Sequence, residues 1–197
     1  MGLTNQSTGS SLLGNNIVID RASFHGSIIA LSGNPNVGKS TVFNSLTGLN
    51  QHTGNWPGKT VATCYGKYRY KNNNFILVDI PGTYSLMANS AEEEVARDFV
   101  CFENPDATVV VTDAACLERN LNLVLQTLEI TDKVIVCVNL IDEAERKKIH
   151  INCKKLSDRL GVPVVATNAR SGRGLDELID TVYNIALGIV RTNPLKI

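Results

Sequence analysis

The stretch Gly33-Asn34-Pro35-Asn36-Val37-Gly38-Lys39-Ser40 decides how the rest of this chain is interpreted. The apolar run Ser27–Leu31 precedes it and predicts a strand, and Thr41–Leu46 follows it with helical character. A strand, a loop bounded by glycines, a Lys-Ser pair and a helix N-terminus form a site for phosphate groups, because the loop N–H groups and the helix dipole point at phosphate oxygens. In this arrangement the lysine reaches the β- and γ-phosphates of a nucleotide, and the serine hydroxyl ligates Mg²⁺. We therefore predict a nucleotide-phosphate site formed by Gly33, Asn34, Pro35, Asn36, Val37, Gly38, Lys39, Ser40 and Thr41.

Composition and charge favour a single soluble domain. The 197 residues are 43% hydrophobic and 19% charged, which allows a sizeable core. Lys plus Arg equals Asp plus Glu at 19 each, so no overall positive field points to nucleic acid or to an anionic membrane. Apolar runs are too short to cross a bilayer, and the five scattered cysteines indicate reduced thiols. We expect a flexible leader or vector-derived remnant over residues 1–26, one domain over 27–190 and the start of a linker over 191–197.

Repeated strand-then-helix units indicate the fold class. Apolar runs predict six strands, over residues 27–31, 61–70, 75–78, 107–111, 134–138 and 163–166. Helical patterns cover residues 41–46, 91–102, 117–128, 143–160 and 175–189, and the Gly- and Pro-containing residues 49–60 predict a mobile loop. We therefore predict an α/β fold with a mostly parallel six-stranded sheet, one antiparallel edge strand over residues 61–70, and helices on both faces.

Polar residues at two strand ends extend the predicted phosphate site, because ligands of such sheets bind at the carboxyl ends of the strands. Asp79 closes a buried strand and precedes Pro81-Gly82. Its carboxylate can hold Mg²⁺, and the Gly82 N–H can bond a γ-phosphate. A lone Asp after a strand usually only starts a turn, and the phosphate loop upstream is what favours the Mg²⁺ role.

Two further strand ends predict recognition of a guanine base. In Asn139-Leu140-Ile141-Asp142 the carboxylate can accept both N1–H and N2–H₂ of guanine, which adenine does not offer, and Asn139 can tie this loop to the phosphate loop. After the last strand, Thr167-Asn168-Ala169-Arg170 can offer the Ala169 N–H to guanine O6. The predicted base-binding residues are Asn139, Leu140, Asp142, Asn168, Ala169 and Arg170.

These five segments, in this order, resemble those of the translation-factor-type small GTPases, which have the Ras-like form of the P-loop NTPase fold. Three stretches more narrowly resemble the amino-terminal G domain of the FeoB family of bacterial ferrous iron transporters. They are Gly54-Asn55-Trp56-Pro57-Gly58-Lys59-Thr60, Asp79-Ile80-Pro81-Gly82-Thr83-Tyr84-Ser85-Leu86 and Asn139-Leu140-Ile141-Asp142. The resemblance covers roughly residues 27–190, and Gly-Asn-Trp-Pro-Gly is its specific part.

The resemblance implies roles for several residues. Thr60 corresponds to the switch I threonine that meets Mg²⁺ and the γ-phosphate, beside Gly58 in the same nucleotide-binding loop. Asn36 is implied to hold K⁺ with backbone carbonyls near Gly54 and Trp56, where K⁺ neutralises charge that develops on the transferring phosphoryl group. An alternative for Asn36 is a turn residue that caps its own loop. The implied catalytic residues are Asn36, Lys39, Thr60 and Gly82; the implied metal ligands are Ser40, Thr60 and Asp79 for Mg²⁺, with Asn36, Gly54 and Trp56 for K⁺.

The chain departs from common GTPase patterns at three positions. Leu140 stands where many GTPases have a lysine that packs on the base, although apolar residues there are usual in the FeoB family. Asn168 stands where serine is commoner. Thr83 replaces the glutamine that orients the attacking water in signalling GTPases, so we expect slow hydrolysis with water held by backbone or by another group.

The implied function is a GTP-binding, slowly GTP-hydrolysing switch domain of a ferrous iron transporter, dependent on Mg²⁺ and stimulated by K⁺. Its implied partners are GTP, GDP and its own downstream helical and membrane domains, at the cytoplasmic face of the membrane, with a possible homo-oligomer in the full-length transporter. Two alternatives stay open. One is a stand-alone GTPase of the ribosome-assembly type, which normally has an RNA-binding module or a basic face. The other is a non-catalytic interaction module that responds to nucleotide.

Overall fold

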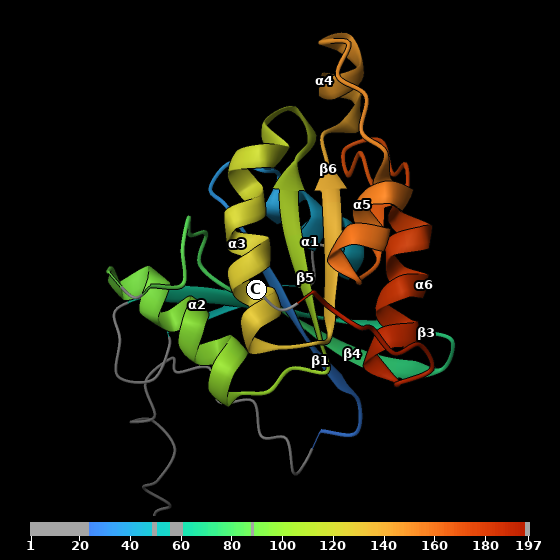
Figure 1. The fold of residues 1–197 in the computed structure, drawn as a ribbon. Helices are drawn as coiled ribbons and strands as arrows, with labels where there is room; N and C mark the ends of the chain where they lie inside the picture. Colours follow the sequence, from blue (N-terminus) through green and yellow to red (C-terminus); the bar gives the residue numbers. More distant parts are fainter. Residues whose placement is uncertain (1–23, 49–50, 56–60, 88, 196–197) are drawn as a thin grey trace, which may run out of the picture.

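A seven-stranded sheet between two layers of helices organises the computed structural model (Figure 1), which describes residues 24–48, 51–55, 61–87 and 89–195. The strands are β1 (Ser27–Gly33), β2 (Gln51–Asn55), β3 (Ala62–Tyr70), β4 (Asn73–Asp79), β5 (Ala107–Asp113), β6 (Val134–Asn139) and β7 (Val164–Ala166). The helices are α1 (Lys39–Thr47), α2 (Ala91–Phe102), the 3₁₀ turn η1 (Ala114–Cys116), α3 (Leu117–Ile130), α4 (Ile141–Arg146), α5 (Cys153–Leu160) and α6 (Leu175–Ala186). The strand order is β2-β3-β4-β1-β5-β6-β7, with parallel pairing from β4 to β7.

The central strands are apolar on both sides because helices cover both faces of the sheet. In β1, Ile28 and Ala30 pack into a core with α2 and α3, while Ile29 and Leu31 pack into a second core with α1 and α6. This two-sided burial explains why the strands appear in the sequence as continuous apolar runs rather than as an alternating pattern. Within the described part of the chain, no helix is long and apolar enough to cross a membrane.

The α/β class, the mostly parallel sheet and the two helical layers are confirmed, but the strand count is not. Residues 51–55, predicted as part of a loop, form β2, which pairs antiparallel with β3 from Gln51↔Gly66 to Asn55↔Ala62. The antiparallel strand β3 is therefore interior, and β2 is the edge. Backbone hydrogen bonds form this strand without an apolar pattern, and the stacking of His52 on Tyr65, 5.2 Å between ring centroids, adds to the pairing.

Two predicted helices end earlier than expected. The single helix over residues 143–160 is two helices, α4 and α5, because Lys148 has a left-handed backbone (φ 58°) and Asn152 begins a new helix by accepting a hydrogen bond from the Lys155 N–H at 2.8 Å. The last helix ends at Ala186, shortly before Gly188, whose φ is also positive (67°). The break between α4 and α5 makes α4 a short helix that projects beyond the sheet (Figure 1).

Lys71, in the turn of the β3–β4 hairpin, contacts α6, and this contact leads to a prediction about how stability depends on pH. Lys71 Nζ pairs with Asp180, lies 5.0 Å from the centre of the Tyr183 ring, and lowers the pKa of the Asp180 carboxyl by hydrogen bonding. A carboxyl with a lowered pKa stabilises the fold above its ordinary value of 3.8, and this contribution is lost as pH falls through the folded pKa. We expect Lys71→Met to be less stable than the unmodified protein at pH 7 in urea denaturation, and this difference to shrink below pH 3.8. A constant difference from pH 7 to pH 3 would assign the effect to lost packing.

Candidate functional site

The phosphate loop predicted from the sequence lies between β1 and α1, at the carboxyl end of the sheet. Asn36 (φ 66°) and Gly38 (φ 81°) both have left-handed backbone, which curls the loop around a cavity. A side chain at Gly38 would place its Cβ 2.4 Å from the Asn139 amide nitrogen, so only glycine fits there. The cavity has a volume of about 500 Å³ and is lined by Asn34, Pro35, Asn36, Gly38, Lys39, Ser40, Thr41 and Gly82. It thus collects most of the predicted phosphate-binding residues; Gly33 and the buried Val37 lie in the loop behind it.

Lys39 and Asp79 form an ion pair at the edge of this cavity. The Lys39 ammonium contacts Asp79 Oδ1, and the two side chains are only 12% and 14% exposed. Burial raises the pKa of the Asp79 carboxyl, and the Lys39 charge opposes that shift. Cys64 lies opposite Asp79 in the β3–β4 register, and its thiol pKa is raised by burial and then by the Asp79 charge. The Cys64 thiol is therefore protonated at neutral pH, and Lys39 is the group that opposes the effect of burial on the pKa of Asp79.

The donors at this position fit a Mg²⁺ ion. The Ser40 hydroxyl follows Lys39 directly, and Asp79 contributes a carboxylate at the end of β4. Both are hard oxygen ligands of the kind that Mg²⁺ prefers. Among the described residues, no three or more His, Cys, Asp or Glu side chains lie together in a group that could hold a metal ion.

Asn139 joins three loops at the end of β6. It is 1% exposed, and its amide nitrogen donates to the Val37 carbonyl of the phosphate loop at 3.0 Å. Its Oδ1 accepts from the Thr167 hydroxyl at 3.1 Å and from the Ala169 N–H at 3.0 Å. The tie between this loop and the phosphate loop that the sequence indicated is therefore present, and the loop after β7 is held by the same side chain.

A second cavity lies beside the phosphate cavity. It has a volume of about 390 Å³ and is lined by Thr41, Asn139, Leu140, Asp142, Glu143, Arg146, Asn168 and Arg170. Thr41 lines both cavities, so they adjoin at the N-terminus of α1. Asp142 lies in the first turn of α4 with its side chain 45% exposed, and Arg146 Nη2 lies 3.9 Å from its Oδ2. This cavity contains five of the six residues predicted to bind the base.

Ala169 is the exception, because the N–H that was predicted to bond guanine O6 is used by another group in this conformation. The residue is 5% exposed and its N–H donates to Asn139 Oδ1, not into the cavity. The physical reason is that the buried Asn139 oxygen needs donors, and the Ala169 N–H is one of the two that reach it. Leu140, which lines the cavity, has a left-handed backbone (φ 60°) that begins α4.

The loop after β4 touches the phosphate loop. Gly82 lines the phosphate cavity, and the Thr83 N–H donates to the Gly33 carbonyl at 3.2 Å. The Thr83 hydroxyl is 2.6 Å from the Ser85 carbonyl, to which it donates, so it is used within its own turn.

Two side chains of α3 that the sequence did not single out hold this loop further on. Gln126 Oε1 accepts from the Leu86 N–H at 2.8 Å, and the Arg119 guanidinium lies 4.7 Å from the Tyr84 ring centre. Gln126 and Arg119 are polar residues of a helix whose sequence pattern is dominated by its apolar positions, so that pattern did not indicate their contacts with this loop. The loop that contacts a γ-phosphate in proteins of this class is thus connected directly to α3.

A third missed contact links the two base-site loops. Arg173 Nη1 bonds both carboxylate oxygens of Glu145 on α4, at 2.9 and 3.2 Å, and the Arg173 carbonyl accepts from the Asn168 N–H at 2.9 Å. Charged residues 28 positions apart give no sequence signal for pairing.

Some predicted residues cannot be placed. Gly58, Thr60 and Trp56 lie outside the described residues. Gly54 is described, as a buried residue of β2 that pairs with Thr63. The proposed K⁺ ligands and the switch I threonine therefore stay predictions.

Fold and site together define a class: a G domain with the P-loop NTPase fold. Its phosphate loop and its Asn139–Asp142 loop line two adjoining cavities, and Asp79 pairs with Lys39 of the phosphate loop. A family profile described as ferrous iron transport protein B matches residues 27–182. The chain belongs to this FeoB family.

Relatives and solved structures agree with this assignment. The Fe(2+) transporter FeoB of Salmonella typhimurium is 44% identical over 154 residues, which are 76% of this chain and 20% of that protein. A Porphyromonas gingivalis Fe(2+) transport protein A/Fe(2+) transporter FeoB fusion protein is 42% identical over 81% of this chain and 19% of its own length. The crystal structure of the T. maritima FeoB G domain is 41% identical, with a TM-score of 0.78, covering 82% of this chain and 99% of that one. The chain thus spans about a fifth of the curated relatives it matches and nearly all of an isolated G domain.

Proposed function

We propose that this chain binds GTP and GDP and hydrolyses GTP slowly, as the switch domain of a ferrous iron transporter. The observation that carries the proposal is that the phosphate cavity and the Asp142 cavity adjoin at Thr41. A relative, the cytosolic domain of T. maritima FeoB, has been solved in a GDP form at 39% identity and a TM-score of 0.83. A guanine nucleotide with its base near Asp142 and its phosphates in the loop fits this shape.

The phosphate side of the site supplies charge and N–H groups. The loop N–H groups and the N-terminus of α1 would bind phosphate oxygens, and Lys39 would exchange its Asp79 partner for the β- and γ-phosphates. Ser40, Asp79 and Thr60 would hold Mg²⁺, which when bound neutralises phosphate charge. Asp79 must be ionised for this, and its raised pKa implies that Mg²⁺ binding weakens in acid.

Hydrolysis would depend on backbone groups near the γ-phosphate. Gly82 lines the phosphate cavity next to the Thr83–Gly33 hydrogen bond, and the Thr83 hydroxyl already donates to the Ser85 carbonyl. We therefore assign the attacking water to backbone groups and expect slow turnover. K⁺ held by Asn36 with carbonyls near Gly54 and Trp56 would raise that rate.

Coupling to Fe(II) uptake would pass from the nucleotide to the downstream helical and membrane domains of the full-length protein, at the cytoplasmic face of the membrane. Loss of the γ-phosphate releases the Gly82 contact, and the Leu86–Gln126 and Tyr84–Arg119 contacts would carry that change to α3. Homo-oligomers in the full-length transporter belong to the same proposal.

The test of catalysis is phosphate release from GTP with Mg²⁺, in K⁺ and in Na⁺. We expect faster turnover in K⁺, and Asn36→Ala to lower the K⁺-stimulated rate by roughly tenfold or more, because a charge-stabilising ligand at the transferring group is lost. GDP affinity should change little, since Asn36 holds the cation. Asn72→Ala, in the exposed β3–β4 turn, is the matched control.

Each outcome separates the alternatives. Equal rates in K⁺ and Na⁺ for the unmodified protein would remove the K⁺ role and keep the GTPase. Tight GDP binding with no phosphate release in either salt would make the chain a non-catalytic interaction module.

A further inference from the structure

One edge of the molecule is strongly basic although the chain as a whole is neutral. Residues 146–155 (Arg-Lys-Lys-Ile-His-Ile-Asn-Cys-Lys-Lys) contain five Lys or Arg residues and no Asp or Glu, whereas the whole chain has 19 of each sign. All five are exposed: Arg146 ends α4, Lys147 and Lys148 lie in the connection between α4 and α5, and Lys154 and Lys155 lie in the first turn of α5. We use the name basic edge for seven exposed residues, which are Arg146, Lys147, Lys148, His150, Lys154, Lys155 and Arg159.

Most of these cations have no acidic partner among the described residues. Arg146 approaches Asp142 and Glu143 at 3.9 and 3.7 Å, but no ion pair joins the other Lys and Arg residues of the basic edge to another described residue. The nearest acidic side chains in sequence are Glu145, which is already bound by Arg173, and Asp158 on α5. The positive charge of the basic edge is therefore available to bind a negatively charged partner.

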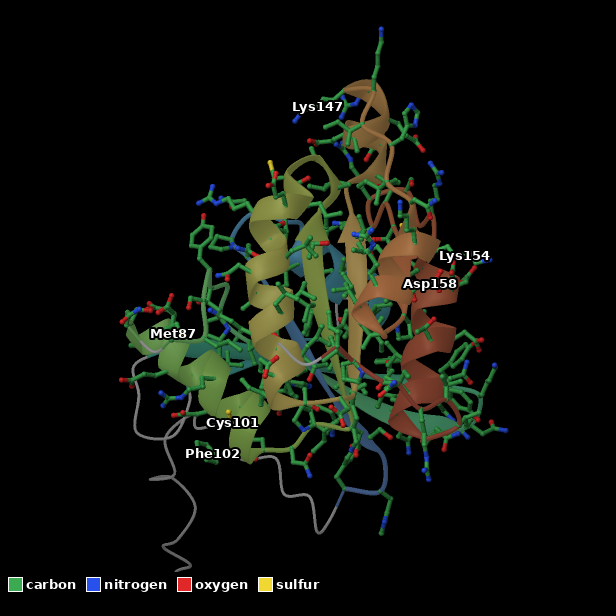
Figure 2. The ribbon with its side chains drawn as sticks, viewed as in Figure 1. Met87, Cys101, Phe102, Lys147, Lys154 and Asp158 are labelled. Atoms are coloured by element: carbon green, nitrogen blue, oxygen red, sulfur yellow. The ribbon has the colours of Figure 1, made fainter. Side chains whose placement is uncertain are left out.

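The basic edge also offers apolar surface. A groove of about 310 Å³ runs between the start of α3 and α5, with Leu117, Ile151 and Leu156 as its apolar lining. Its remaining lining residues are His150, Asn152, Lys155 and Arg159. Ile149, in the projecting loop, is 38% exposed. Figure 2 shows Lys147 at the outer end of α4 and Lys154 on α5, both directed away from the body of the molecule.

We propose that the basic edge binds the anionic lipid surface of the membrane. The inference rests on the proposed function, which places the chain next to the bilayer. Clustered lysines beside exposed aliphatic residues match an anionic headgroup layer over an apolar interior, and each Lys or Arg near such a surface contributes roughly fivefold to binding. Nucleic acid is the less favoured polyanion, because residues 143–160 contain no Phe, Tyr or Trp on which bases could stack.

Binding of the basic edge to a membrane would bring the nucleotide site close to the bilayer. Arg146 belongs both to the basic edge and to the lining of the Asp142 cavity, and α4 connects the two. Docking of the basic edge therefore places α4 between the base cavity and the bilayer.

The test is co-sedimentation of the chain, loaded with GDP, with vesicles of phosphatidylglycerol and phosphatidylcholine or of phosphatidylcholine alone. We expect binding only when phosphatidylglycerol is present, with affinity that falls as salt is raised. The triple variant Lys147→Glu/Lys154→Glu/Lys155→Glu should bind the anionic vesicles at least roughly a hundredfold more weakly than the unmodified chain. Its matched control, Lys67→Glu/Arg69→Glu/Lys133→Glu, has the same net charge change at exposed positions outside the basic edge and should lose roughly threefold at most. GDP affinity and thermal unfolding of both variants confirm that they are folded.

Three results would overturn the proposal. The first is an equal loss in both triple variants, which would reduce the effect to net charge. The second is absence of vesicle binding by a chain that binds GDP normally, which leaves the proposed function intact. The third is tighter binding to single-stranded nucleic acid or to polyglutamate than to the anionic vesicles at the same salt. Failure to bind GDP at all would instead count against the proposed function.

Discussion

Replacing Asn139 with alanine is expected to lower the free energy of unfolding by about 3–5 kcal/mol and to weaken GDP binding by more than roughly tenfold. The side chain is 1% exposed and makes three hydrogen bonds, with the Val37 carbonyl, the Thr167 hydroxyl and the Ala169 N–H. Alanine leaves all three groups buried without this partner, which costs about 1–3 kcal/mol for each group that water cannot reach. For a domain of this size the loss lowers Tm by about 10 °C, measurable by circular dichroism.

The same contacts explain why nucleotide binding should fall with stability. Asn139 joins the phosphate loop to both base-site loops, so its loss frees them to move relative to one another. Asn120→Ala is the matched control, because Asn120 is also buried (4% exposed) and accepts one bond, from the Asp113 N–H at 2.7 Å, away from the cavities. It should cost about 1–2 kcal/mol and leave GDP affinity unchanged. If Asn139→Ala were no less stable than Asn120→Ala, the three-loop junction would not be a main source of stability.

The parts of the fold that follow from local chemistry were predictable. Continuous apolar runs such as Val134–Val138 become central strands because both faces of the sheet are covered, and the Gly33–Ser40 loop follows from its spacing alone. The strand β2 was not predictable, since His52 and Thr53 are exposed and polar and join the sheet through backbone pairing. The break between α4 and α5 depends on the left-handed backbone of Lys148, which the lysine side chain does not encode.

The candidate site likewise contains some features that the sequence predicts and others that only the fold reveals. Residue types with a known preference, such as the Lys39-Ser40 pair and Asp142, were found by their spacing, and the structure places them in two adjoining cavities. Contacts between distant residues were missed, as with Arg173 and Glu145 or Leu86 and Gln126, because each needs the fold to bring its partners together. The Ala169 N–H was misassigned because the sequence cannot show that Asn139 already uses it.

Net charge says nothing about how charge is distributed. Equal numbers of acidic and basic residues gave no indication of an anionic partner, because a sum over the whole chain hides a local excess of one sign. The basic residues after Arg146 gather in the connection from α4 to α5 and in the first turn of α5, where Lys147 and Lys154 point away from the body of the molecule (Figure 2).

Asp142→Asn is expected to exchange guanine for xanthine specificity. In the proposed pose the two carboxylate oxygens accept N1–H and N2–H₂ of guanine, and bonds to a charged acceptor contribute about 1.5–3 kcal/mol each. Asparagine keeps one acceptor and presents an N–H₂ to the guanine amino group, so GDP affinity should fall roughly 10²- to 10⁴-fold. Xanthine has a carbonyl in place of that amino group, which the new amide can bond. Competition of GDP and xanthosine diphosphate against a fluorescent nucleotide measures both affinities.

The control for this exchange lies one residue away. Glu143 lines the same cavity, carries the same charge and, like Asp142, lies near Arg146. Glu143→Gln removes one negative charge from the cavity without touching the proposed base contacts, and GDP should remain preferred over xanthosine diphosphate. If both variants lost GDP affinity equally, the cavity would act through its overall charge, and Asp142 would not be the residue that selects guanine. An unchanged preference for GDP in Asp142→Asn would show that Asp142, although it lines this cavity, does not select the base.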